Sequence, residues 1–243
     1  MASLKGRVAL VTGGSRGIGR AIAISLAEAG AAVMVNYREA AAEAGAVADA
    51  ITKAGGRAVA VGADVSDAAD VARLIAAAER ELGPVDVLVN NAGIALMRGV
   101  DDLTEEDFDR TIAVNLKSVF LCTQAVVPGM RARRWGRIVN ISSGAARGAG
   151  GVGPHYNASK AGLEGLTRGY AARLVKDGIT VNAVAPSLIE TDMVRQGLAS
   201  AASRIPLGRF GTPEECAQVV MMLIGNAYMT GQTVALSGGM SFV

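Results

Sequence analysis

Several features are scarce in this sequence of 243 residues. Its two cysteines, Cys122 and Cys216, lie far apart and match no metal-binding or redox spacing, which predicts buried, reduced thiols. A net charge of +2 gives no overall field for binding nucleic acid. The N-terminal residues contain no apolar signal segment, and no run of about 18 uncharged apolar residues occurs. We therefore expect a soluble, cytoplasmic chain with no metal, membrane or nucleic-acid partner.

Aromatic residues make up only 4% of the chain, whereas 51% of the residues are hydrophobic and 31 are glycines. This composition is typical of an aliphatic core around a parallel sheet with short turns. Seven β-branched runs, apolar on both faces, alternate with helical patterns, as in parallel strands covered by helices. We expect an α/β fold, with one domain over residues 1–243 and a doubly wound, seven-stranded parallel sheet. The expected strands are 7–13, 31–37, 57–65, 85–93, 136–143, 179–187 and 232–238.

Ligands of doubly wound sheets bind beyond the carboxyl ends of the strands. The first expected strand ends in "TGGSRGIG", residues 12–19, where glycines let the backbone approach a pyrophosphate and the next helix offers free N–H groups. The spacing is G-G-x-x-G-x-G and not the common G-x-G-x-x-G. Its place between a strand and a helix nevertheless predicts a nucleotide site. The residues expected to form it are Gly13, Ser15, Arg16, Gly17, Ile18 and Gly19.

The end of the second strand predicts which dinucleotide binds. An acidic residue about 20 positions beyond the glycines usually holds the ribose 2′-hydroxyl of NAD. Here the sequence is Asn36-Tyr37-Arg38, and the first carboxylate is Glu39. Arg38 and Arg16 would present two guanidinium groups to a 2′-phosphate; the alternative is that both are solvated surface arginines. We expect NADP(H) in preference to NAD(H), with Tyr37 and Arg38 in its site.

The stretch "GPHYNASKAGLEG", residues 153–165, places Tyr156 and Lys160 one helical turn apart, as neighbours on a helix surface. A free tyrosine with a pKa of about 10 is a poor acid at neutral pH. An adjacent lysine cation would lower that pKa. The same spacing is common on solvated helices, so other motifs must support this interpretation. For His155 we expect a loop imidazole that lines the pocket and does not act as a catalytic acid or base.

A series of motifs follows one order along the chain. They are Thr12-Gly13-x-x-x-Gly17-x-Gly19, Asn90-Asn91-Ala92-Gly93, Asn115, Ser143 after "IVNIS", and Tyr156-x-x-x-Lys160. In this order the chain resembles the short-chain dehydrogenase/reductase family, in its single-domain Rossmann branch. It is most similar to bacterial 3-oxoacyl-acyl-carrier-protein reductases through "GRIVNISS", "YNASKAGLEGLTR", "GITVNAVAP" and "ETDM".

The resemblance implies a catalytic tetrad. Tyr156 would protonate a ketone oxygen as hydride arrives, and Ser143 would hydrogen-bond that oxygen. The alternative for Ser143 is a strand-end hydroxyl that caps local backbone, a part expected of its neighbour Ser142. Lys160 would hold the nicotinamide ribose, and Asn115 would hold a water in a relay to Lys160. The alternative for Asn115 is a satisfied core amide. The family's remaining cofactor contacts fall on Asp64, Val65, Asn91, Ala92, Gly93, Pro186, Ile189 and Thr191, beside Tyr156 and Lys160.

The substrate stays open at this stage. We expect NADPH-dependent reduction of a ketone, either a 3-oxoacyl thioester or a small ketone, sugar or polyol. A nucleotide-binding sensor without turnover is the alternative from another class. Residues 188–211, including Met193 and Leu198, indicate a lid for an apolar or acyl substrate. The family usually has Pro-Gly where this chain has Pro186-Ser187, and serine would be strained there if the backbone required positive φ.

Partners are predicted from the same resemblance. Arg131, Arg133 and Arg134 could dock an acidic acyl carrier protein, or could simply favour the dipole of a helix C-terminus. Asp177 stands where the reductases often carry a docking arginine, which weakens the first interpretation. The family implies a homotetramer, formed by the helices around Asn115 and after Tyr156 and by the last strand.

Overall fold

The seven apolar runs form seven strands in the computed structural model, which describes residues 3–191 and 199–241. All strands of this described part pair in parallel, in the order β3-β2-β1-β4-β5-β6-β7. The predicted doubly wound sheet is therefore confirmed. The strands are β1 (Val8–Val11), β2 (Ala32–Tyr37), β3 (Arg57–Gly62), β4 (Val87–Asn90), β5 (Gly136–Ile141), β6 (Ile179–Pro186) and β7 (Thr233–Leu236).

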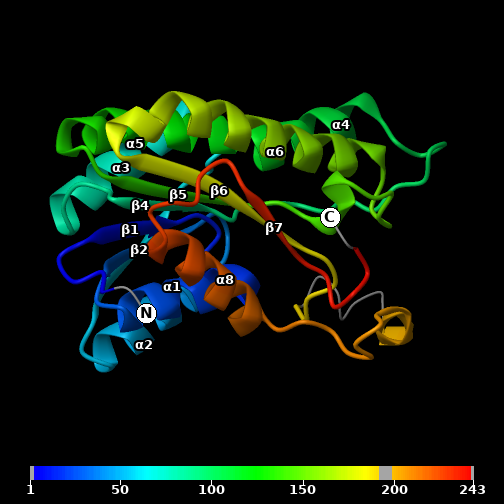
Figure 1. The fold of residues 1–243 in the computed structure, drawn as a ribbon, viewed down its shortest axis with the longest axis horizontal. Helices are drawn as coiled ribbons and strands as arrows, with labels where there is room; N and C mark the ends of the chain where they lie inside the picture. Colours follow the sequence, from blue (N-terminus) through cyan, green and yellow to red (C-terminus); the bar gives the residue numbers. More distant parts are fainter. Residues whose placement is uncertain (1–2, 192–198, 242–243) are drawn as a thin grey trace.

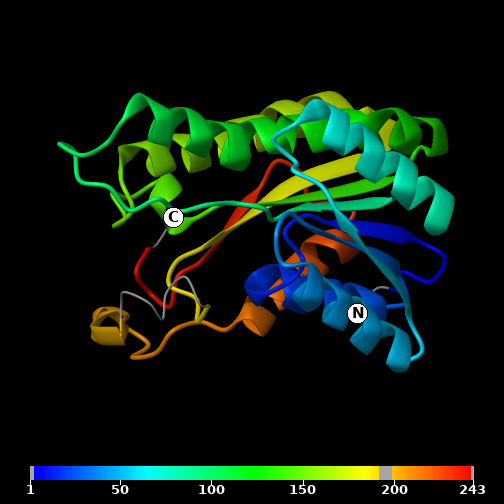
Figure 2. The ribbon, with the colours of Figure 1, turned by 180° about the vertical axis from the view of Figure 1, so that it is seen from behind.

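Helices cover both faces of the sheet (Figures 1 and 2). One layer consists of α1 (Gly17–Glu28), α2 (Ala41–Lys53) and α8 (Pro213–Gly225). The other consists of α3 (Ala68–Glu81), α4 (Glu105–Ile112), the π-helical turn η1 (Ala113–Lys117), α5 (Ser118–Arg133) and α6 (Pro154–Leu174). Short 3₁₀ turns lie at η2 (Gly144–Ala146), η3 (Val175–Asp177) and η4 (Ala199–Arg204).

The strands are buried on both faces, so alternate residues feed two cores. Along β1, Ala9 and Val11 pack with Leu26 of α1, whereas Leu10 packs with Met130 of α5. Both cysteines are buried and free, and burial raises the pKa of each thiol to about 12. The expected buried, reduced thiols are confirmed.

Residues Glu105–Arg133 form a continuous helix that is long and apolar enough to cross a membrane by length and composition alone. Its buried side packs against the sheet, with Cys122, Val126 and Met130 inside the core shared with α3. This helix is therefore a core helix of the fold. Its start is fixed by Thr104, whose hydroxyl accepts a hydrogen bond from the amide of Asp107.

Candidate active site

A cavity of about 550 Å³ lies along the carboxyl edge of the sheet, where the strands end in turns. Ser143 lines this cavity, and so do all the residues predicted to contact a cofactor. The set comprises Gly13, Ser15, Arg16, Gly17, Ile18, Gly19, Tyr37, Arg38, Asp64, Val65, Asn91, Ala92, Gly93, Tyr156, Lys160, Pro186, Ile189 and Thr191. Segments far apart in the sequence thus meet in one site, as parallel strands require.

The glycine turn between β1 and α1 brings its backbone close to neighbouring groups. Gly13 and Gly17 adopt φ of 60° and 53°, in the left-handed region that favours glycine. A Cβ atom at Gly19 would lie 2.2 Å from the carbonyl oxygen of Gly13 and 2.5 Å from Nδ2 of Asn91. The Asn91 amide donates to the carbonyl oxygens of Thr12 and Gly13, both at 2.9 Å. The turn is therefore held in one compact shape by its own backbone and by Asn91.

Asn36 is a site residue that the sequence reasoning did not single out for this purpose. Its Oδ1 accepts from the Gly13 amide at 3.3 Å, and its Nδ2 lies 3.1 Å from the carbonyl oxygen of Ala63. The side chain is 2% exposed and joins the glycine turn to the ends of β2 and β3. The available signal was a buried amide at the end of a β-branched run, because such a group must find partners.

The two arginines expected near the dinucleotide differ in their surroundings. Arg16 is the exposed N-cap residue of α1. Arg38 forms an ion pair with Glu39, and its Nη1 lies 4.0 Å from Oδ2 of Asp64. Burial alone would raise the pKa of Asp64, but hydrogen bonds from Ser66 and the nearby positive charges, including Arg38, hold it below its usual value.

Ser143 and Tyr156 meet across the cavity. Ser143 follows β5 and caps η2, where its hydroxyl accepts from the Ala145 amide at 3.2 Å. The hydroxyl of Ser143 also lies close enough to the phenol of Tyr156, in the first turn of α6, to favour the phenolate. A ketone oxygen placed at these two hydroxyls would face two hydrogen-bond donors.

Lys160 lies one turn further along α6, and its surroundings differ from the expectation. Its Nζ donates to the carbonyl oxygen of Ile141 at 2.9 Å and lies 5.7 Å from the centroid of the Tyr156 ring. Burial lowers the pKa of Lys160 to about 8. Burial raises the pKa of Tyr156, and the neighbouring Ser143 hydroxyl only partly opposes this. The expected lowering of the tyrosine pKa by the lysine was wrong for this arrangement, because desolvation of the phenolate dominates.

Asn115 is the one predicted catalytic residue that does not line the cavity. It is fully buried in the π-helical turn. Its Oδ1 accepts from the Ile94 amide at 2.8 Å, and its Nδ2 donates to the Ile94 carbonyl at 2.9 Å and to Oγ of Ser159 at 3.2 Å. The side chain thus matches the alternative, a satisfied core amide, and it fixes Ile94 in the cavity wall.

His155 is also placed differently from the expectation of a loop imidazole lining the pocket. It belongs to the first turn of α6, is 0% exposed and lies outside the cavity lining. Its Nε2 lies 2.9 Å from the carbonyl oxygen of Leu96. The ring occupies the space beside Gly153, where a Cβ atom would approach Cε1 of the imidazole to 2.7 Å. The prediction failed because the helix begins before His155 and turns the ring inward.

The loop after β6 accommodates Ser187 without strain. Among the described residues, only Arg134 combines a side chain with positive φ, so Ser187 is not left-handed. The Ser187 amide donates to the Leu236 carbonyl at 2.9 Å. The serine hydroxyl lines the cavity, close to Gly144. The substitution of serine for the usual glycine therefore changes the lining and leaves the backbone relaxed.

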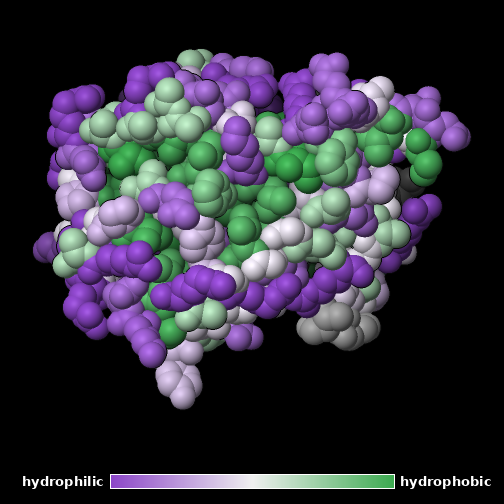
Figure 3. Space-filling model, turned by 90° about the horizontal axis from the view of Figure 1, so that it is seen from above, coloured by the Kyte–Doolittle hydropathy of each residue, from purple (hydrophilic) through white to green (hydrophobic). Residues whose placement is uncertain are grey.

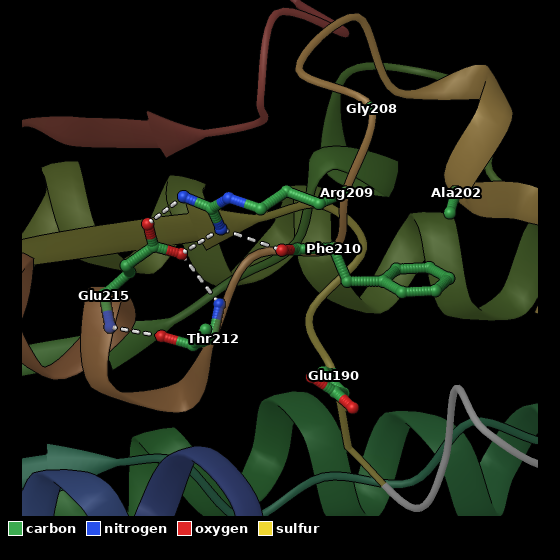
Figure 4. A pocket seen from close by; sticks show the side chains of 7 residues that line it. All are labelled: Glu190, Ala202, Gly208, Arg209, Phe210, Thr212 and Glu215. Atoms are coloured by element: carbon green, nitrogen blue, oxygen red, sulfur yellow. Dashed lines mark hydrogen bonds and ion pairs between the residues drawn. The ribbon is translucent and has the colours of Figure 1, made fainter.

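Part of the expected lid borders a second cavity of about 490 Å³ (Figure 4). Met193 and Leu198 lie outside the described residues. Arg209 pairs with Glu215 through two contacts, of 2.7 and 3.0 Å, and these bonds lower the pKa of Glu215 to about 2. Ile189, which lines the first cavity, forms a parallel bridge with Gly211, which lies in the sequence between Phe210 and Thr212 of the second cavity's lining.

The arginines considered for docking all have partners within the chain. Arg131 pairs with Asp177 at 2.7 Å, and Arg133 pairs with the buried Asp86 at 3.1 Å. Arg134 donates to the carbonyl oxygen of Lys176 at 3.0 Å. Asp177, the departure noted in the sequence, is thus the partner of Arg131. The cluster lies at the amino edge of β4 and β5, away from the cavity.

Comparisons with known proteins agree with this geometry. The family described as short chain dehydrogenase matches residues 7–201. A 3-oxoacyl-[acyl-carrier-protein] reductase from Synechocystis sp. is 44% identical over 99% of both chains. A hydroxynaphthalene reductase-like protein from Metarhizium guizhouense is 39% identical over 98% of this chain and 96% of its own.

A solved structure of a dehydrogenase/reductase from Sinorhizobium meliloti has the same fold. It superposes with a TM-score of 0.90 at 41% identity, covering 98% of this chain and 96% of its own. Fold, motif order and full-length similarity therefore agree. The chain belongs to the short-chain dehydrogenase/reductase family and is an NAD(P)-dependent oxidoreductase that acts on CH–OH groups.

Proposed function

We propose that this protein reduces a ketone to a secondary alcohol with NADPH, and that its substrate is a 3-oxoacyl thioester. The observation that carries the proposal is the meeting of the Ser143 and Tyr156 hydroxyls in a cavity that also contains the glycine turn. The similarity to the 3-oxoacyl-[acyl-carrier-protein] reductase of Synechocystis supports the choice of substrate. The catalytic unit would be a single domain over residues 1–243, acting in cytoplasmic fatty acid synthesis.

The residues of the cavity fit a dinucleotide. Close approach at Gly13 and Gly19, where a side chain would collide with backbone, leaves room for a pyrophosphate at the N-terminus of α1. Lys160 would hold the nicotinamide ribose, and Asp64 would accept from the adenine amino group. Ile189 and Thr191, which also line the cavity, would contact the carboxamide.

The chain's own groups would carry the proton. When bound, NADPH supplies a hydride. Ser143 donates a hydrogen bond to the ketone oxygen and orients it toward Tyr156. Tyr156 then gives its proton to that oxygen as negative charge builds there, and its raised pKa keeps the phenol protonated until this step. Lys160, with a pKa of about 8, would return the proton to the phenolate through water.

NADPH is favoured over NADH by the charges at the end of β2. No carboxylate follows the strand at Tyr37 or Arg38, and Arg16 and Arg38 both line the cavity. Glu39 already pairs with Arg38 and would compete with a 2′-phosphate. Asp64 also lies 4.0 Å from Arg38, so the preference rests on the two guanidinium groups as donors to a 2′-phosphate and not on a net positive charge.

Carrier-protein docking and assembly are separate parts of the proposal. The thioester assignment does not depend on Arg131, Arg133 and Arg134, since each is already bound within the chain. A homotetramer is supported by exposed apolar side chains at Phe120 and Val175, which are 42% and 48% exposed. The face above α5 and α6 shows apolar areas between hydrophilic rows (Figure 3).

The decisive experiment is a substrate panel that follows NADPH absorbance. It should contain acetoacetyl and longer 3-oxoacyl thioesters, small ketones, sugars and the corresponding polyols with NADP⁺. We expect the highest kcat/KM on the thioesters. Inactivity on thioesters with turnover of small ketones or sugars would move the assignment to the second enzyme class. Tight NADPH binding without turnover of any member would favour the sensor.

A further inference from the structure

A buried carboxylate outside the predicted tetrad binds the segment that carries Ser143. Glu164 lies on α6, one turn after Lys160, and is 4% exposed. Its Oε1 accepts from Oγ of Ser142 at 3.2 Å, and its Oε2 accepts from Nε of Arg147 at 3.0 Å. Each oxygen is therefore used by a different residue. A charged group at this depth requires such partners.

The two partners of Glu164 lie on either side of Ser143 in the sequence. Ser142 immediately precedes it, and Arg147 follows the short turn η2 that Ser143 caps. The backbone amide of Ser142 also donates to the Val184 carbonyl of β6 at 2.7 Å. The segment is thus fixed to the sheet through its backbone, and to α6 through this carboxylate and through the Ser142 hydroxyl, which also lies 3.4 Å from the carbonyl oxygen of Lys160.

The helix that carries Glu164 also carries the proposed proton donor. Tyr156 and Glu164 are two turns apart on α6, so their relative positions are set by a rigid helix. A carboxylate that binds Ser142 and Arg147 consequently fixes Ser143 relative to Tyr156. Asn157 holds the outer part of the same loop, because its amide donates to the carbonyl oxygens of Gly148 and Ala149, both at 2.7 Å.

We propose that Glu164 is a positioning residue, which holds the Ser143 hydroxyl against Tyr156 through Ser142 and Arg147. This inference rests on the proposed roles of Ser143 and Tyr156. Two hydroxyls that must converge on one ketone oxygen depend on close placement, and a displacement of about 1 Å can lower a rate about 100-fold. The carboxylate itself touches neither substrate nor cofactor.

Two variants break the contact from opposite sides. Glu164→Gln keeps the volume and an acceptor for Ser142 but turns an amide toward Arg147. Arg147→Met removes the guanidinium from a side chain that is 35% exposed, so it should fold even if Glu164→Gln does not. We expect each to lower kcat about tenfold, with KM for NADPH within about twofold of wild type. Arg147→Lys should recover most of the loss, because it keeps a cation near the carboxylate.

Combination with Ser143→Ala separates positioning from a purely structural role. If Glu164 acts through Ser143, adding Glu164→Gln or Arg147→Met to Ser143→Ala should lower kcat no further. Fully additive losses would overturn the proposal, as would single variants with kcat within about twofold of wild type. The matched control is Arg80→Met, which removes an exposed Arg–Glu pair at the end of α3 and should leave kcat unchanged.

A further measurement keeps the two proposals apart. If wild type reduces no ketone in the panel, the proposed function fails, and amide hydrogen exchange then tests the contact alone. Exchange across residues 143–149 should be faster in Arg147→Met than in wild type at equal overall stability. Unchanged exchange would overturn the positioning role whatever the activity.

Discussion

The ammonium of Lys160 is bonded to the carbonyl oxygen of Ile141, at 2.9 Å, and points to the end of β5. The lysine is therefore an inward-facing, desolvated cation in this cavity, and its pKa falls to about 8. Its effect on the neighbouring phenol is secondary to burial. This relationship gives the protein a measurable dependence of stability on pH.

The contribution of Lys160 to the free energy of unfolding should rise with pH between about 8 and 10.5, the folded and unfolded pKa values of this lysine. In this window the unfolded chain binds more protons at the lysine than the folded chain, so raising the pH favours folding. Below pH 8 the ammonium of Lys160 is charged in both states, and the full cost of burying that charge lowers the free energy of unfolding. The difference is on the order of 3 kcal/mol. Urea unfolding should show that the free energy of unfolding of wild type minus that of Lys160→Met rises across this range, because the opposing titration of Cys122 and Cys216 is common to both proteins. Parallel curves would contradict the low pKa of the lysine.

Tyr156→Phe should reduce turnover at least about 1000-fold, because it removes the proton that the phenol would give to the ketone oxygen. NADPH affinity should stay within about threefold, since the ring remains in place. Stopped-flow turnover and fluorescence titration of NADPH measure the two effects. Tyr170→Phe, on the same helix, is the matched control and should retain wild-type kcat. Normal turnover in Tyr156→Phe would remove the phenol from the mechanism.

Arg38→Ala should weaken NADPH binding about tenfold or more, because a charge-assisted bond to the 2′-phosphate is lost. NADH affinity should change less than about twofold, as NADH lacks that phosphate. Glu39→Gln should strengthen NADPH binding a few-fold by releasing Arg38, the effect being small because Glu39 is 78% exposed. Fluorescence titrations with both dinucleotides provide the comparison. Equal losses for the two cofactors would assign Arg38 to another role.

Arg133→Met should lower the free energy of unfolding by about 1–3 kcal/mol, because the buried Asp86 loses a charged donor and the Val85 carbonyl loses a partner. Arg131→Met, which breaks a more exposed pair with Asp177, should cost less than about 0.5 kcal/mol. Both should keep wild-type kcat on small thioesters. Reduced activity of Arg131→Met on carrier-bound substrate alone would restore the docking interpretation.

Much of the fold was predictable because parallel strands buried on both faces appear in the sequence as nearly continuous apolar runs. The β-branched runs and the glycine turn fixed the sheet and its binding edge. The N-cap at Thr104 was also predictable, and its hydroxyl accepts from the amide of Asp107. The side chain of Asp107 instead pairs with Arg98. Long-range ion pairs of this kind leave no local sequence pattern.

The side chains that were misplaced or not recognised from the sequence share a physical cause. His155, Asn36 and Glu164 are polar groups whose partners come from other elements, so no spacing within their own segment reveals them. The pKa of Tyr156 was misjudged for a related reason. The sequence shows the neighbouring lysine but not the depth of burial, and burial decides the direction of the shift.

Gly19→Ala should abolish NADPH binding. The added Cβ atom would lie 2.2 Å from the Gly13 carbonyl oxygen and 2.5 Å from Nδ2 of Asn91, and neither can move without opening the turn. Gly45→Ala in α2 is the matched control, because nothing lies within 4 Å of its added Cβ. That change should stabilise the protein by about 0.5–1 kcal/mol and leave NADPH affinity unchanged.

The pair of glycine variants separates backbone crowding from helix propensity. Both changes add one methyl group in a helix, so propensity alone would predict a similar gain in stability for each. Thermal unfolding without NADPH measures the change in stability, and the rise of Tm on adding NADPH measures whether the dinucleotide still binds. Gly45→Ala should keep the full rise of Tm with NADPH, whereas Gly19→Ala should lose it. A normal NADPH-induced rise in Gly19→Ala would mean that the pyrophosphate does not sit on this turn.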